Sequence, residues 1–128
     1  MADSEGSHRR QAWTKDPSDG GWLALSDDEL LFHVEGLPAD HEKDAQLMEV
    51  IRSQRHFFVR QEAAKRIRDP HLLKEQSGDR HIGQILARRM TRSDDIAYLE
   101  KLIAETRHLE VRKAADVQLK SILAKEKK

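Results

Sequence analysis

The chain has 128 residues, enough for one hydrophobic core but too few for two independent ones, so we expect a single folded unit. Charged residues make up 36% and aromatic residues only 5%, which favours solvated helices over a sheet of aromatic and β-branched residues. The net charge is zero, and the absence of cysteine excludes disulfides, thiolate zinc sites and cysteine nucleophiles.

The charge is distributed unevenly along the chain. Residues 1–46 contain 4 basic and 11 acidic residues, residues 47–92 contain 11 and 5, and residues 93–128 contain 8 and 7. The front is therefore acidic and the middle basic. No apolar stretch approaches the roughly 20 residues of a membrane span and no leader opens the chain, so we expect a cytoplasmic protein with no membrane partner.

Residues 1–25 are polar and show no helical or strand period, which predicts a disordered, acidic N-terminal tail. Residues 26–128 are the predicted helical domain. It begins with a capping box, Ser26-Asp27-Asp28-Glu29, in which serine and glutamate satisfy free N–H groups of a first short helix. We expect Gly36 to end this helix in a left-handed conformation, ahead of the helix breaker Pro38.

Six further helices are predicted from apolar spacing, capping residues and breakers. They pair into three hairpins, at about residues 40–68, 69–92 and 93–125. The expected caps of four of these helices are Asp40, Asp69, Asp79 and Ser93. The expected helices run from about His41 to Ser53, Phe57 to Arg68, Pro70 to just before Gly78, Asp79 to Thr91, Ser93 through Ile103, and Leu109 towards Lys125.

An internal repeat supports this pairing. Residues 47–67 (LMEVIRSQRHFFVRQEAAKRI) align without gaps on residues 99–119 (LEKLIAETRHLEVRKAADVQL), an offset of 52 residues. Residues 79–90 (DRHIGQILARRM) occupy the place of a second helix between the two copies. A mean period of about 26 residues indicates a supersecondary unit that must stack on its neighbours to bury its apolar side.

Two short segments, each a Val-Arg pair followed by alanines, resemble the second helices of HEAT repeats. They are Val59-Arg60 with Ala63-Ala64 and Val111-Arg112 with Ala114-Ala115. The resemblance implies an all-α fold, namely a short right-handed α-solenoid of about three HEAT-like helical hairpins preceded by a short capping helix. It also implies that Val59, Val111 and the two arginines are structural repeat positions, and that the arginines brace one repeat against the next.

This chain departs from the family pattern at the acidic position of the second helix. His56 and His108 stand there in the first and third units, and only Asp79 keeps the acid. In the second unit the arginine position is Gly83. We therefore expect the ladder of ion pairs between neighbouring repeats to be interrupted.

We find no pattern that predicts catalysis, a cofactor, a small-molecule ligand or a metal site. The chain lacks a Gly-x-Ser-x-Gly turn and a phosphate-binding glycine loop, so we expect no enzyme. Seven histidines occur, but without the His-Glu-x-x-His spacing, and His33 with His41 make a poor ligand set. We expect ordinary surface or capping histidines.

The resemblance implies a non-enzymatic protein–protein interaction or scaffold module that binds a partner on the ridge of second helices. The residues expected to contact it are polar and fall between the inward positions of those helices. They are Gln61, Lys65, Arg68, Gln84, Arg88, Lys113 and Lys120.

The basic block leaves the class of partner open. Six cations are expected along one edge, Lys65, Arg66, Arg68, Arg88, Arg89 and Arg92. They suit a solvated face, a protein partner with an acidic surface, or duplex nucleic acid bound through residues 60–92. We expect at least one of Phe57 and Phe58 to be buried, which argues against base stacking on single strands. The acidic front could instead fold back and mask the basic face.

Overall fold

The computed structural model describes residues 21–127, and every regular element in this part of the chain is helical. The predicted all-α class is therefore confirmed for these residues. The elements, with η for a 3-10 helix, are η2 (Trp22–Ala24), α2 (Asp27–Glu35), α3 (Asp44–Arg52), α4 (Phe57–Arg66), η3 (Pro70–Gln76), α5 (Arg80–Arg89), η4 (Ser93–Asp95), α6 (Ile96–Glu105) and α7 (Leu109–Glu126). None of the described helices is both long enough and apolar enough to cross a lipid bilayer.

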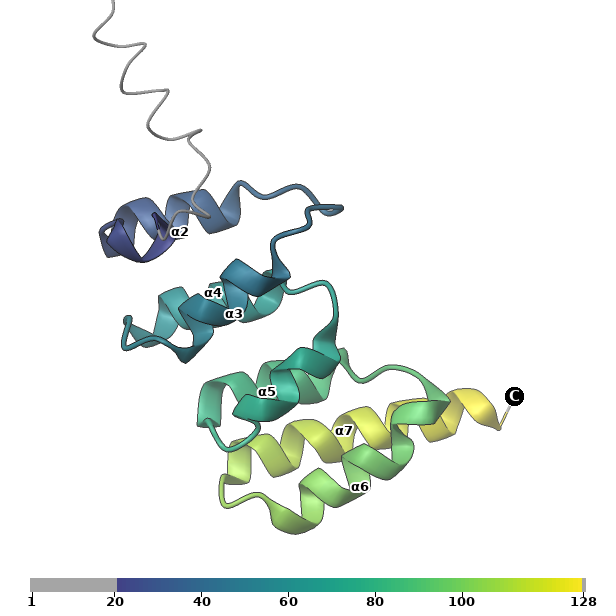
Figure 1. The fold of residues 1–128 in the computed structure, drawn as a ribbon. Helices are drawn as coiled ribbons and strands as arrows, with labels where there is room; N and C mark the ends of the chain where they lie inside the picture. Colours follow the sequence, from purple (N-terminus) through teal and green to yellow (C-terminus); the bar gives the residue numbers. More distant parts are fainter. Residues whose placement is uncertain (1–20, 128) are drawn as a thin grey trace, which may run out of the picture.

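The helices pack in pairs that follow one another along the chain. α3 packs against α4, η3 against α5, and α6 against α7. The second members also pack on one another, α4 on α5 and α5 on α7. At the N-terminal end, α2 packs against the second helix α4, and η2 packs against the first helix α3. These two elements therefore extend the row of second helices and the row of first helices. Figure 1 shows the pairs one above another, from α2 at the top to α6 and α7 at the bottom.

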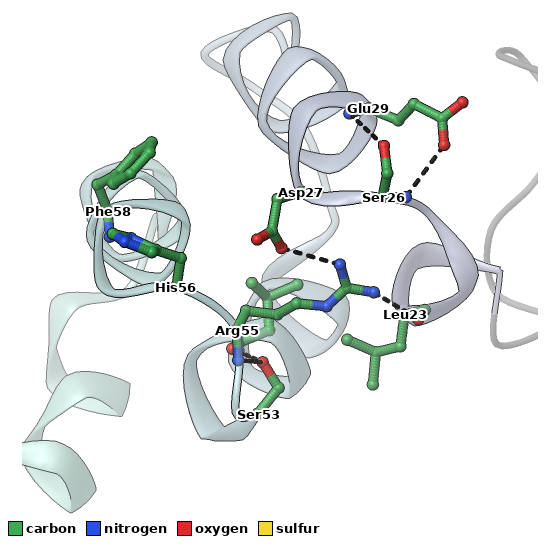
Figure 2. A network of polar contacts seen from close by, with 9 residues as sticks. Leu23, Ser26, Asp27, Glu29, Ser53, Arg55, His56 and Phe58 are labelled. Carbon is green, nitrogen blue, oxygen red and sulfur yellow. Dashed lines mark hydrogen bonds and ion pairs between the residues drawn. The ribbon is translucent and has the colours of Figure 1, made fainter.

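The first helix begins with the predicted capping box, which is confirmed. The Glu29 N–H donates to Ser26 Oγ over 3.2 Å, and the Ser26 N–H donates to Glu29 Oε1 over 3.0 Å (Figure 2). Its predicted left-handed end is wrong, because Gly36 has φ −85° and ψ −1°. The helix instead ends in a tightened turn in which the Leu37 N–H donates to the Val34 carbonyl, directly before Pro38.

The boundary predicted after residue 25 lies too late. Trp22 is only 1% exposed, and its indole lies edge-on to the imidazole of His33 with 4.8 Å between ring centroids. Arg55 fastens the same segment from the α3–α4 loop, donating to the Leu23 carbonyl over 2.6 Å and to Asp27 over 3.0 Å (Figure 2). The folded part therefore already includes Trp22. Residues 1–20 of the predicted tail lie outside the described residues.

Two predicted helix ends are wrong because distant partners hold the chain in other conformations. α3 begins at Asp44 and is not capped by Asp40. The buried His41 prevents an earlier start, since its Nδ1 accepts from the Lys43 N–H and its Nε2 lies 2.7 Å from the Arg66 carbonyl. α4 ends at Arg66, because the Asp44 carboxylate accepts from the N–H groups of Arg68 and Asp69 in the segment that follows.

The remaining helix starts are mixed in outcome. Asp79 caps α5 as predicted, accepting from the N–H groups of His81 and Ile82 over 2.8 and 3.0 Å. Asp69 caps the element before α5 as predicted, but that element is the 3-10 helix η3 instead of an α-helix. Ser93 makes no cap hydrogen bond, and the buried Asp95 accepts from the Arg92 N–H in its place. α5 ends at Arg89, two residues before the predicted Thr91.

The second helices meet through small and β-branched side chains. The fully buried residues on them are Val59, Ala63, Ala64, Ile82, Leu86, Ala87, Val111 and Ala115. At Gly83 the backbone of α5 lies close to Val111 of α7. A Cβ built there would lie 2.9 Å from Val111 Cγ2 and 3.1 Å from the Ser77 carbonyl oxygen. The absence of a side chain at residue 83 is therefore what lets the last two hairpins pack together.

Replacing Gly83 with valine tests this contact. We expect Gly83→Val to lower the free energy of unfolding by about 1–3 kcal/mol, the usual cost of overpacking a filled core. Gly78→Val is the matched control, because a Cβ at Gly78 meets nothing within 4 Å. We expect the control to stay within about 0.5 kcal/mol of the wild type. Urea unfolding followed by circular dichroism measures both, and equal effects would contradict the assignment.

Candidate partner-binding surface

The two repeat arginines make the same hydrogen bond in two hairpins. Arg60 Nε donates to the Ile51 carbonyl over 2.7 Å, and Arg112 Nε donates to the Ile103 carbonyl over 3.3 Å. Donor and acceptor are nine residues apart in both cases, and the two pairs are related by the repeat offset of 52. Each arginine thus ties the second helix of a hairpin to the end of its own first helix.

Only Arg60 also reaches the next hairpin. Its Nη1 lies 3.0 Å from Asp79 Oδ2, and the two side chains are 18% and 21% exposed. Arg112 is exposed and its Nη2 donates to the Thr106 carbonyl, within its own hairpin. Among the described residues, Arg60 therefore links two hairpins, whereas the hydrogen bonds of Arg112 stay within its own hairpin.

The expected interruption of the ladder lies between the second and third hairpins. Gly83 occupies the arginine position of the second hairpin, and His108 occupies the acidic position of the third. His108 Nε2 lies instead 3.0 Å from the Gly78 carbonyl oxygen. A hydrogen bond to the backbone and the close contact at Gly83 thus take the place of an ion pair at this junction.

The two arginines provide a matched pair of variants. We expect Arg60→Ala to lower the free energy of unfolding by about 2 kcal/mol, because it leaves a half-buried carboxylate and a carbonyl without their charged donor. Arg112→Ala should cost less than about 1 kcal/mol, since it removes only exposed contacts. Thermal unfolding measures both losses, and a larger loss for Arg112→Ala would contradict this assignment.

Asp79 is held in its ionised form at the junction of the first and second hairpins. Burial opposes its ionisation, but hydrogen bonds from the Ile82 and His81 N–H groups and the Arg60 guanidinium outweigh burial and lower its pKa. A carboxyl group with a lowered pKa in the folded state stabilises the fold above its unfolded pKa of about 3.9. That contribution disappears as the pH falls from about 4 through the folded value.

Asp79→Asn should therefore change the acid dependence of stability. We expect the variant to be less stable than the wild type at pH 7 and to lose less stability between about pH 4 and pH 2, because the titrating group is gone. Melting temperatures measured across this range test the difference. Glu126→Gln, at an exposed position, should keep the wild-type acid dependence.

Three of the predicted contact residues lie together in an open groove of about 400 Å³ between α5 and α7. They are Gln84 and Arg88 on α5 and Lys113 on α7. Arg88 Nη2 donates to Gln84 Oε1 over 3.3 Å, so these two side chains form one wall. Val117 lies on the other side and is 67% exposed, which gives the groove an apolar side chain beside its cations. The rest of the lining is Glu110, Ala114 and Gln118.

Lys65 and Arg68 lie apart from that groove, in a hollow of about 580 Å³ at the C-terminal end of α4. Arg68 Nη1 donates to the His41 carbonyl over 3.0 Å, and Lys65 Nζ lies 3.9 Å from Glu62. Gln61 and Lys120 line neither hollow. Lys120 pairs with Asp116 over 3.0 Å on the exposed surface of α7. Of the seven predicted residues, three therefore line the groove, two line the hollow at the end of α4, and two line neither.

The predicted basic edge is largely occupied by contacts within the protein. Arg66 Nε donates to Glu62 Oε2 over 3.1 Å. Arg89 Nη1 donates to the Ile67 carbonyl and, over 3.3 Å, to the Ala64 carbonyl. Burial lowers the pKa of Arg89, while Asp44 and Asp69 oppose the shift. These cations stabilise the end of α4, which leaves a smaller basic surface than their number indicates.

The aromatic residues at the start of α4 form an exposed cluster, contrary to the expectation that at least one phenylalanine is buried. Phe57 and Phe58 are 46% and 50% exposed. His56, the N-cap of α4, lies against both rings. Figure 2 shows it beside Phe58. The ring of Phe57 also stacks on His81, at 4.8 Å between centroids. The two phenylalanine rings therefore pack against each other and against neighbouring histidines, and not into the hydrophobic core.

No metal site is formed by the described residues, among which no three His, Asp or Glu side chains converge as ligands. His33 packs on Trp22, and both ring nitrogens of His41 have hydrogen-bond partners. Burial, and next the nearby Lys43, lower the pKa of His33.

Sequence analysis missed a larger hollow of about 810 Å³ beside η3 and α6. Its lining includes Lys74, Tyr98, Lys101 and Arg107, none of which was singled out. These residues come from two hairpins and a loop, so no spacing along the chain connects them. The only available signal was the charge of the residues themselves.

Known proteins add no information on this surface. No protein-family model matches the chain, and neither the curated proteins nor the solved structures include a match.

Proposed function

We propose that this protein is a non-enzymatic binding or scaffold module, built as a short right-handed α-solenoid of HEAT-like hairpins. The hairpin packing in chain order and the recurrence of one arginine–carbonyl bond at the repeat offset support the solenoid. Such a stack presents its second helices side by side, and a partner bound across them contacts several hairpins at once.

We place the partner in the groove between α5 and α7, because it gathers side chains from two hairpins. A bound segment would pack an apolar side chain against Val117 and Ala114 and place an acidic group between Arg88 and Lys113. A buried apolar anchor supplies most of the affinity of such contacts, and the charges around it select the partner. The partner we propose is therefore a protein with an acidic surface and an apolar anchor residue.

Duplex nucleic acid bound through residues 60–92 is the second candidate. The excess of arginine and lysine in that segment favours it. The contacts of Arg66, Arg68 and Arg89 with carbonyl and carboxylate groups weigh against it, since phosphate contacts would have to replace them.

Affinity capture with charge-reversal variants tests the proposal. The tagged chain and the double variant Arg88→Glu/Lys113→Glu are used to capture proteins from an extract of the source cells. Affinity for a captured partner is then measured with purified proteins. We expect the double variant to bind the partner at least about tenfold more weakly, because the two new glutamates would repel the acidic group of the partner.

Lys125→Glu/Lys127→Glu is the control, since it makes the same charge change outside the groove. Equal loss of affinity in both double variants would reject the groove as the binding site. A titration of random duplex DNA against salt covers the second candidate. Affinity that falls steeply with salt and disappears in Arg88→Glu/Lys113→Glu would favour nucleic acid over the protein partner.

A further inference from the structure

The hollow beside η3 and α6 has a lining unlike that of the groove between second helices. It lies between the end of η3, one face of α6 and the loop from α6 to α7. Its volume of about 810 Å³ is in the range of small-molecule sites. The lining includes Lys74, Tyr98, Lys101, Leu102, Glu105 and Arg107.

Positive charge dominates this lining. Lys74, Lys101 and Arg107 face a single acid, Glu105. None of the three cations forms an ion pair with another described residue. Lys74 Nζ lies instead over the ring of Tyr98, 4.3 Å from its centroid. Cations drawn together without a carboxylate partner favour an anionic ligand.

The hollow also offers hydroxyl donors and an apolar floor. The Tyr98 phenol is half-buried, and the Ser77 hydroxyl belongs to the same lining. Burial raises the pKa of Tyr98, so the phenol keeps its proton and can donate. Leu102, only 5% exposed, provides an apolar surface beside the Tyr98 ring. A ligand with both an anionic head and a planar body would match this combination.

Hydrogen bonds within the protein hold the walls in place. Arg112 Nη2 donates to the Thr106 carbonyl over 3.1 Å, which fixes the start of the loop. The His108 N–H donates to Thr106 Oγ1, and His108 Nε2 lies 3.0 Å from the Gly78 carbonyl oxygen. The loop is thereby joined to the preceding hairpin, so binding would require little ordering of the chain.

We propose that this hollow binds a phosphate monoester attached to a ring-sized body. Lys101 and Arg107 would contact the phosphate oxygens, and Lys74 would complete the positive surface. The ring would lie against Tyr98 and Leu102. Phosphate is favoured over a carboxylate because three cations line one hollow, which suits a group carrying about two negative charges. The inference does not depend on the partner-binding groove, which lies between other elements.

Titration with phenyl phosphate, followed by the amide resonances of the full-length, isotope-labelled chain, tests the site. We expect saturable shifts at Ser77, Gly78 and Tyr98 and along residues 101–108. Inorganic phosphate should bind more weakly because it lacks the ring, and phenol should bind more weakly because it lacks the charge. Shifts spread evenly over all basic helix surfaces, or none at all, would overturn the proposal.

Variants of the charged lining separate a site from general attraction of anions. We expect Lys101→Gln/Arg107→Gln to weaken phenyl phosphate binding by at least about tenfold. Glu105→Gln should strengthen binding, because it removes the one opposing charge. Both changes are at exposed positions, so folding is not at risk. Lys125→Gln/Lys127→Gln is the charge-matched control, and an equal loss there would overturn the proposal.

The phosphate monoester could belong to a free small molecule or to a modified side chain of a partner. Adenosine monophosphate and a short peptide containing phosphotyrosine distinguish these sources, and the tighter ligand identifies the source. If neither binds more tightly than inorganic phosphate, the ring-sized body is excluded and the proposal fails in this form.

Discussion

The structure depends on how closely its second helices approach one another. α4 packs on α5 and α5 on α7, and the fully buried side chains on these helices are mainly alanine and valine. Helices of nine or ten residues, such as α3 and α5, are marginal in water by themselves. Their stability therefore comes from the neighbouring hairpins, and the size of the residue at positions such as Gly83 decides whether the neighbours fit.

The same dependence determines the use of arginine in this chain. Arg60, Arg89 and Arg112 all donate to backbone carbonyls at or near helix ends. The last carbonyl groups of a helix have no N–H partner within the helix. Their charge stabilises the packing of hairpins and is not free for a ligand. Cations that remain available lie elsewhere, on the groove between α5 and α7 and on the hollow beside α6. The formal charge of a segment is thus a poor guide to its binding surface.

Two caps made by neighbouring residues were predictable from the sequence, and helix ends set by distant residues were not. The capping box at Ser26 and the cap at Asp79 each act within three residues, and apolar spacing identified the inward faces. The start of α3 and the end of α4 are set by contacts about 25 residues away along the chain. Spacing also placed Gln84, Arg88 and Lys113 on one surface, because all three lie between inward positions. The lining of the large hollow escaped prediction, since it comes from two hairpins and a loop.

The end of α4 has a consequence for the order in which the protein can fold. Its last carbonyls accept hydrogen bonds from His41, which precedes the helix, and from Arg89, which follows it by more than twenty residues. A chain emerging from the ribosome would have formed the first of these contacts while the second was still unavailable. The final turn of α4 would therefore stay loosely held until α5 was made, which couples completion of one hairpin to synthesis of the next.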